Sequence, residues 1–472
     1  MRIIKIISVY LALSLILNSS YSQAWKEHGP LKVSRNGHFL VHEDGSMFFW
    51  TGDTPWALFT LDEREVEEYL ADRAGRDFNV IQLMTTRVKS KTFGYATLPG
   101  LNGQYLQMNA YGEIPLKSVR PVALNDKFWD HMEYIVDRAA DYGIYTAIVV
   151  MWGRSADKLF PDPLKDNFEY GRLIAERFRD KPNVIWVASG ELYTINQGGK
   201  DKYLSEEQVS LLSAIGRGLK AGAGENQLIT IHGQGEWHRM PSTYFHNEEW
   251  LDFHMNQSWD RICFIDSMMV NDWNLDNPKP TLLSEAKYEG SFYPHYTLNA
   301  AKGDYCSDWH VRLQAYWSVF SGGFGHTYGA LGLWNCDGIL DKKILEYPGA
   351  DDMRHLKNLF ESKPSLTRVY DNSFINRNTT DDRNQLDVVL GTWDKSRTWA
   401  FVYTSQGSKI TVDLGKFDAK YLYASWYDPR IGVYRNIGKF QAKGEMDFDP
   451  PGVRNKKVYK GADWILVLDN NP

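Results

Sequence analysis

The sequence of 472 residues has only three cysteines, Cys263, Cys306 and Cys336. So few cysteines in a chain of this length exclude a disulfide framework, and their spacing is not that of a metal site. We expect buried thiols, with a Cys306–Cys336 disulfide as the alternative. An excess of basic residues is also lacking, because 53 Lys and Arg stand against 59 Asp and Glu. This balance argues against a nucleic-acid partner.

Apolar runs long enough to span a membrane are absent from the sequence. The apolar run Ile6–Leu17 follows Arg2 and Lys5 and precedes small serines, which is the pattern of a signal peptide over residues 1–22. The mature chain is therefore expected to begin near Gln23 and to be exported, either periplasmic or secreted. The sequence leaves the oligomeric state open.

Several catalytic signatures are missing as well. We find no phosphate-binding loop, no HExxH and no GxSxG, and we expect neither a metal nor a cofactor. No His or Cys follows Pro364, which excludes thiol chemistry and His- or Cys-ligated metals there. Aromatic residues are plentiful instead, at 14% with 17 Trp and 27 Tyr. Their flat apolar faces and polar edges suit sugar rings, although a large core also uses aromatics.

Eight short apolar segments alternate with helical patterns over most of the chain. Continuous apolar strands that alternate with helices indicate a parallel sheet covered on both faces. Eight units fit an α/β fold of the (β/α)8 TIM barrel type better than the alternative, an open doubly wound sheet. The expected strands are Phe48–Thr51, Asn79–Met84, Tyr145–Trp152, Val184–Val187, Leu228–Ile231, Phe253–Gln257, Thr281–Ser284 and Phe324–Tyr328.

The pattern changes after Pro364, where short alternating strands replace the helical period. We expect residues 365–472 to form an antiparallel β-sandwich domain packed on the barrel. The barrel domain then covers residues 23–364 and begins with a β-hairpin cap. Most aromatic residues of the sandwich are expected in its core or interface, and a solvent-facing strip for sugar is the alternative. They are Trp393, Trp399, Tyr403, Trp426, Tyr427 and Trp464.

Catalytic residues of such barrels lie at the C-terminal ends of the strands. Glu191 and Glu285 follow the fourth and seventh expected strands, and Glu289 is the alternative to Glu285. Two carboxyls that face a sugar can hydrolyse a glycosidic bond. A separation of about 5–5.5 Å between them gives retention of the anomeric configuration, and ~6.5–9.5 Å gives inversion. The strand ends also supply the expected substrate-binding residues, which are Asp53, Trp56, Arg87, Trp152, His232, Gln234, Gln257, Trp259, Glu289, His326, Tyr328 and Trp334.

Each of these residues also has a structural interpretation. Asp53 precedes Thr54-Pro55 and suits an Asx-turn, and single histidines are more often structural. Any one of the tryptophans is about as well explained by core packing. Glu191 suits a helix start.

Four ordered segments resemble one known family. They are GDTPW at 52–56, NVIWVASGE at 183–191, LLSEAKYEG at 282–290 and RLQAYWSVFSGGFGHTYG at 312–329. These segments resemble the apiosidase-like glycoside hydrolases of family 140. WYDPRIGVY at 426–434 and DWILVL at 463–468 resemble the C-terminal module of that family, which has been labelled a collagen-binding domain. The resemblance covers nearly the whole mature chain.

This resemblance implies a retaining mechanism, with Glu191 as acid/base and Glu285 as nucleophile. It also implies an apioside of plant cell-wall pectin as the oligo- or polysaccharide substrate. The chain departs from the family at Ser189-Gly190-Glu191, where Gly-Gly-Asp is common, so its carboxyl reaches one methylene further. Acidic sugars are expected to meet local cations such as Arg87 or Arg154.

Two other functions remain open at this point. One is a non-catalytic polysaccharide- or collagen-binding protein with an inactive barrel, against which the two strand-end carboxylates argue. The other is a barrel hydrolase of another glycosidic linkage.

Overall fold

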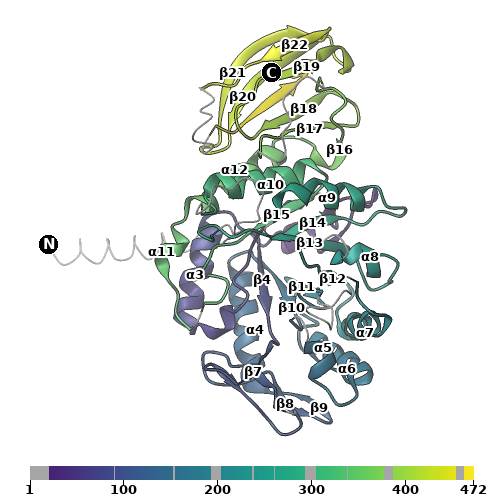
Figure 1. Cartoon of the computed structure of the whole chain (residues 1–472), viewed down its shortest axis with the longest axis vertical. Helices are drawn as coiled ribbons and strands as arrows, with labels where there is room; N and C mark the ends of the chain where they lie inside the picture. The colour runs from purple at the N-terminus through teal and green to yellow at the C-terminus, as the bar shows by residue number, and fades with distance from the viewer. Residues whose placement is uncertain are drawn as a thin grey trace, which may run out of the picture.

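The computed structural model is a closed barrel of eight parallel strands with helices around it, joined to an all-β domain (Figure 1). It describes residues 21–89, 91–101, 103–152, 155–192, 203–235, 239–259, 261–292, 305–336, 338–376, 386–452 and 462–471. Because the last strand of the barrel pairs with the first, the predicted (β/α)8 fold is confirmed. The barrel strands are β3 (Trp50–Asp53), β4 (Val80–Met84), β10 (Tyr145–Val149), β11 (Val184–Val187), β12 (Ile229–His232), β13 (Phe253–Trp259), β14 (Thr281–Ala286) and β15 (Gly325–Tyr328).

Side chains cap the start of some of the barrel helices. Asp62 accepts a hydrogen bond from the Glu65 amide at 2.9 Å, and Ser205 forms a capping box with Gln208. The helices around the barrel are α3 (Glu63–Gly75), α4 (Asp126–Asp141), α5 (Ser155–Lys158), α6 (Pro163–Arg177), α7 (Glu206–Gly222), α8 (Pro241–Phe245), α9 (Ile265–Trp273), α10 (Asp308–Phe320), α11 (Lys342–Leu345) and α12 (Pro348–Glu361). The N-terminal cap consists of α2 (Ala24–His28) and the hairpin of β1 (Leu31–Val33) and β2 (Leu40–His42).

A β-rich segment between β4 and α4 was not foreseen from the sequence. It holds a three-stranded antiparallel sheet in the order β5-β7-β6 and a separate hairpin. Its strands are too short to show a periodic pattern, which is why the sequence did not reveal them. They are β5 (Val88–Lys89), β6 (Tyr95–Ala96), β7 (Tyr105–Gln107), β8 (Leu116–Val119) and β9 (Val122–Leu124).

The C-terminal domain has a six-stranded antiparallel sheet in the order β16-β17-β18-β23-β20-β21. The two-stranded sheet β19-β22 pairs separately, and a second apolar core includes residues of both sheets. The aromatic residues expected in the core of this domain are all buried, from Trp393 to Trp464. The strands are β16 (Arg368–Tyr370), β17 (Val389–Asp394), β18 (Trp399–Thr404), β19 (Ile410–Asp413), β20 (Tyr421–Asp428), β21 (Val433–Gln441), β22 (Glu445–Phe448) and β23 (Trp464–Asp469).

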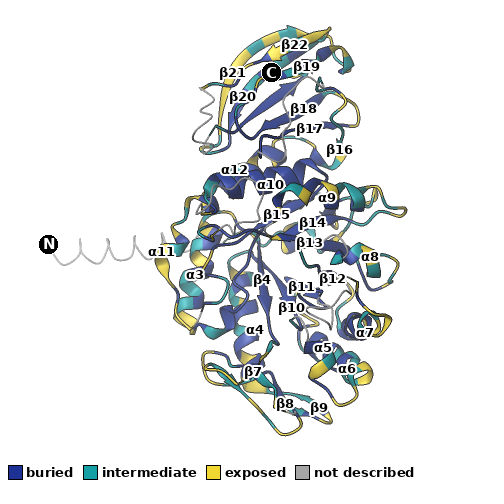
Figure 2. Ribbon diagram, viewed as in Figure 1, coloured by how far each residue is buried: buried dark blue, intermediate teal, exposed yellow. Residues whose placement is uncertain are grey.

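Helix α10 joins the two domains and is buried on every side from Trp309 to Phe320 (Figure 2). The Tyr316 ring stacks on Tyr403 with centroids 4.9 Å apart, and the Trp309 indole donates to the Ser405 carbonyl at 2.9 Å. A helix that is buried all round needs partners on both sides, and the C-terminal sheet provides the second one.

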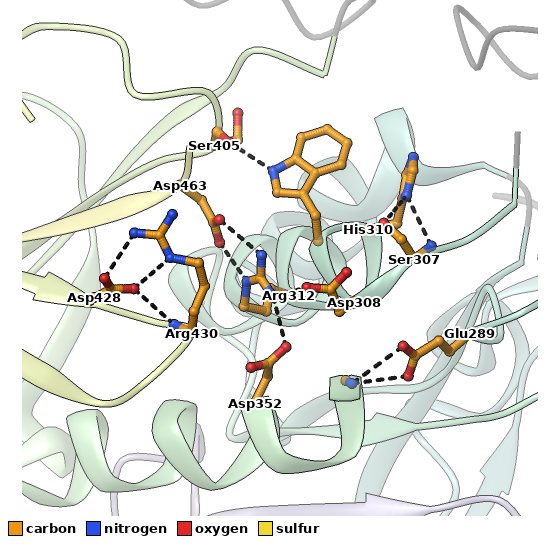
Figure 3. A network of polar contacts seen from close by, with 12 residues as sticks. Glu289, Ser307, Asp308, His310, Arg312, Asp352, Ser405, Asp428, Arg430 and Asp463 are labelled. Carbon is orange, nitrogen blue, oxygen red and sulfur yellow. Dashed lines mark hydrogen bonds and ion pairs between the residues drawn. The ribbon is translucent and has the colours of Figure 1, made fainter. Parts of the chain in front are cut away.

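A buried ionic cluster lies at the same junction (Figure 3). Arg312 of α10 donates to Asp463 at 2.8 Å, to Asp352 of α12 at 2.7 Å and to Asp308 at 2.7 Å. The side chains of Arg312 and Asp463 are 1% and 0% exposed. Removing one partner of a buried ion pair leaves an uncompensated charge, so this cluster fixes the C-terminal domain on the barrel.

Arg312→Ala is therefore expected to lower the free energy of unfolding by about 3–5 kcal/mol. Chemical denaturation of the full chain measures this loss. The control is Arg64→Ala, whose ion pair with Glu68 is solvent-exposed and contributes about 0.5 kcal/mol. Equal stability of the two variants would contradict the role of Arg312.

Candidate active site

Glu285 is the more buried of the two predicted catalytic carboxyls and lies near the end of β14, with only 4% of its surface exposed. Gln257 donates to its Oε2 at 2.7 Å, and Tyr288 donates its hydroxyl to Oε1. The Trp56 indole donates to the same Tyr288 hydroxyl at 2.8 Å. Burial and the negative charge of Glu191 raise the pKa of Glu285, whereas Tyr288, Gln257 and Trp56 lower it. Burial and a nearby like charge both favour the neutral form of a carboxyl, and hydrogen-bond donors favour its ionised form.

Glu191 follows β11 and is half-buried. The preceding residue, Gly190, pairs with Trp152, and a Cβ atom on Gly190 would lie 2.3 Å from the Trp152 ring. Only glycine therefore lets the chain pass this tryptophan. Glu191 itself has a φ of 45°, a left-handed conformation that costs a non-glycine residue about 1–3 kcal/mol. Such strain is concentrated at functional sites.

Aromatic side chains surround the two carboxyls. Trp56 and Trp152 have ring centroids 4.9 Å apart, and the edge of Trp56 meets His232 at 5.5 Å. His232 Nε2 lies 3.4 Å from Glu285 Oε2. Because burial lowers the pKa of His232 to about 4, this imidazole is a neutral neighbour of Glu285 at neutral pH rather than a counter-ion.

Trp259, at the end of β13, is the exposed member of the group, with 37% of its surface accessible. It also has a left-handed backbone, with φ at 46°. Its ring meets Tyr288 edge-on at 5.2 Å, and the Lys287 ammonium lies 4.8 Å from its centroid. An exposed indole next to the buried carboxyl offers a face on which a sugar can stack.

Three further predicted residues lie at the loops around this group. Arg87 lies over the Trp334 ring at 5.7 Å, and the Trp334 carbonyl accepts the Ala57 amide at 3.2 Å. Gln234 accepts a hydrogen bond from Arg239. Arg154, the other cation expected to meet acidic sugars, lies outside the described residues.

Three predicted substrate-binding residues point away from the site, so the structure does not bring them together with the two carboxyls. Asp53 is 0% exposed and accepts from Arg73 at 2.6 Å and from Tyr69 at 2.7 Å. His326 contacts Ser318 of α10 at 3.3 Å, and Tyr328 donates to Glu289 at 2.7 Å. Alternate residues of a barrel strand face inward and outward, and these three face the helices.

Glu289, the alternative nucleophile, also has a structural role. Its carboxylate accepts the Gly349 amide at the start of α12, at 3.1 Å to Oε2 (Figure 3). It also accepts the Tyr328 hydroxyl at 2.7 Å. A carboxylate at a helix N-terminus is stabilised by the unpaired amides there. The side chain is 5% exposed and occupied by these partners, which gives Glu289 a structural role, and its binding of substrate stays a prediction.

Tyr288 is the residue that sequence reasoning missed. Its hydroxyl donates to Glu285 and accepts from the Trp56 indole at 2.8 Å, so it joins β3 to β14. The only signal was its position three residues after Glu285 in the segment LLSEAKYEG, which does not reveal that the chain turns back on itself.

The remaining sequence predictions concern metals, membranes and thiols. Among the described residues there is no group of three or more His, Cys, Asp or Glu side chains placed to hold a metal ion. No helix in the described part of the chain is both long and apolar enough to cross a bilayer. Cys263, Cys306 and Cys336 are free thiols, so the alternative Cys306–Cys336 disulfide is not formed.

A glycosidic bond breaks when one carboxyl protonates the leaving oxygen while a second attacks the sugar or activates water. The fold and the comparisons with known proteins define a glycoside hydrolase. The chain belongs to the family described as "Apiosidase-like, catalytic domain", whose model matches residues 34–367. Residues 369–469 match the model described as "Putative collagen-binding domain of a collagenase".

Solved structures agree with this assignment. A protein described as "Glycoside hydrolase" is 28% identical, with a TM-score of 0.77, and the match covers 96% of this chain and 99% of that one. A glycoside hydrolase family 5 protein from Bacteroides vulgatus ATCC 8482 is 27% identical, with a TM-score of 0.76 and coverage of 96% and 95%. No curated protein matches the chain.

The raised pKa of Glu285 makes stability depend on pH. A carboxyl that holds its proton more tightly when folded loses stabilisation as the pH rises above its ordinary value of 4.5, because the carboxyl of the unfolded chain then ionises while the folded one keeps its proton. Glu285→Gln removes this loss. The melting temperature of the variant minus that of the wild type is expected to be larger at pH 9 than at pH 5.

Glu113→Gln is the control for this measurement. Asn125 and Lys127 lower the pKa of Glu113, which therefore stays ionised from pH 5 to pH 9. The melting temperature of Glu113→Gln minus that of the wild type is therefore expected to be the same across that pH range. If the melting-temperature difference for Glu285→Gln were also independent of pH, the raised pKa of Glu285 would be contradicted.

Proposed function

We propose that this glycoside hydrolase is an exported, retaining apiosidase that acts on the side chains of plant cell-wall pectin. The observation that carries the mechanism is Glu285, a buried carboxyl that accepts hydrogen bonds from Gln257 and Tyr288 and whose pKa the charge of Glu191 raises. The observation that supports the substrate is the family match over residues 34–367.

The surroundings of the two carboxyls favour a different catalytic role for each. Gln257 and Tyr288 donate to Glu285, and the Trp56 indole donates to the Tyr288 hydroxyl, so the protein stabilises the ionised form of Glu285, which is the form that attacks the anomeric carbon. In this proposal Glu191 carries the proton, which it gives to the leaving oxygen before it takes another from water. The separation of about 5–5.5 Å that retention needs remains a prediction.

Glu285→Gln is expected to lower kcat by about 10⁴-fold or more, because the amide keeps the shape of the side chain and loses its nucleophilicity. The matched control is Glu289→Gln, four residues further on, which keeps one acceptor for the Gly349 amide and is expected to retain most of the activity. Turnover numbers and circular dichroism of both variants check this. The reverse pattern would make Glu289 the nucleophile.

Pectic side-chain oligosaccharides are expected to release apiose, and xylans and mannans are expected to release no sugar. Proton NMR of the first product is expected to show the anomeric configuration of the substrate, as a double displacement requires. Release of another sugar, with none from apiosides, would leave the two-carboxyl mechanism in place and overturn the specificity. A product of opposite configuration would overturn retention.

Export rests on the signal-peptide pattern of residues 1–22. N-terminal sequencing of protein recovered from the periplasm or the medium is expected to begin near Gln23. Recovery of the uncleaved chain from the cytoplasm would contradict export.

A further inference from the structure

The small sheet β5-β7-β6 begins at the mouth of the barrel. It follows β4 directly, so it leaves the barrel at the C-terminal strand ends, where Glu191 and Glu285 also lie. The Thr86 carbonyl accepts the Trp152 amide at 2.8 Å, and the Val88 amide donates to Ser155 at 3.3 Å. These bonds fix the start of β5 beside the loop that carries Trp152.

The two faces of this sheet differ in chemistry. Val88 pairs with Leu106, and both pack against the main apolar core. Lys89 pairs with Tyr105 on the opposite, outer face. Arg87, two residues before Lys89, shares that face because side chains alternate along a strand.

Tyr95 of β6 completes the outer face. It pairs with Gln107, two residues after Tyr105, and donates its hydroxyl to the Gln107 amide oxygen at 3.0 Å. The Lys89 ammonium lies 5.3 Å from the centroid of the Tyr95 ring. At the turn between β5 and β6, the Phe93 ring is fully exposed. The outer face therefore combines cations with aromatic rings.

The charge of this segment is opposite to that of the whole chain. Residues 79–125 carry a single acid, Glu113, whereas the chain has a net charge of −6. Glu113 is already engaged, by Asn125 at 3.0 Å and by Lys127 at 3.5 Å. The five basic residues of the segment are Arg87, Lys89, Lys91, Lys117 and Arg120.

We propose that the outer face of β5-β7-β6, formed by Arg87, Lys89, Tyr95 and Tyr105, binds the uronate backbone of an acidic polysaccharide whose side branch enters the catalytic site. The proposal rests on the proposed function, since it names the chain that carries the cleaved branch. Cations attract the carboxylates of such a backbone, and tyrosine rings accept its sugar faces. Arg87 also lies over Trp334, so the face is continuous with the loops around the site.

Affinity electrophoresis of the full chain tests this proposal with two probes, polygalacturonate and the same polymer after methyl esterification. The wild type is expected to bind polygalacturonate more tightly, and the preference is expected to fade with salt. Lys89→Gln with Lys91→Gln is expected to weaken polygalacturonate binding about tenfold, without changing the weaker binding of the esterified polymer. Tyr105→Ala is expected to weaken both, because stacking does not depend on the carboxylate.

The matched control is Lys420→Gln with Lys439→Gln, which removes two cations near Tyr421 in the C-terminal domain. This variant is expected to bind as the wild type does. Loss of binding in the control variant alone, or equal binding of the two polymers by the wild type, would overturn the proposal. Preferential binding through Lys89 and Lys91 without release of apiose would uphold it and contradict the proposed specificity instead.

Discussion

A carboxyl buried next to a second carboxyl is the constraint on which the site depends. In such surroundings an ionised Glu285 is costly, and it is stabilised only by donors that come from separate parts of the chain. Gln257 comes from β13, Trp56 follows β3 and Tyr288 follows β14. Closure of the barrel between β15 and β3 is what brings these segments to one place. The Gly235 amide in turn holds the Gln257 oxygen at 2.8 Å, so the donor is itself oriented.

The C-terminal domain reaches this region through buried polar contacts. Asp463 binds Arg312, and Arg312 binds Asp352 in the first turns of α12. The first turn of the same helix donates the Gly349 amide to Glu289, which directly follows Tyr288 (Figure 3). The segment that supplies a donor to Glu285 is thus supported from the far domain. This arrangement explains why a module without catalytic residues is packed on the barrel so closely.

The sequence predicted the barrel because short, continuous apolar strands and their helices repeat eight times, and it placed Glu191 and Glu285 at strand ends for the same reason. It did not show which face of a strand each side chain occupies. Asp53, His326 and Tyr328 also lie at strand ends, yet they face the helices, since a shift of one residue reverses the direction of a side chain. The sheet β5-β7-β6 escaped notice because strands of two or three residues show no period.

The contrast between the two glutamates supports their different roles. Glu285 is almost fully buried, which raises its pKa, and the Gln257 and Tyr288 donors oppose that rise, which suits a nucleophile that must ionise away from water. Glu191 is half-buried and in a left-handed conformation, which suits a group that must meet first the leaving sugar and then a water molecule. Gly190 leaves no room for a side chain against Trp152, so the direction of Glu191 is set by packing before any substrate binds. Catalysis benefits when such orientation precedes the reaction, because no reorganisation is then needed in the transition state.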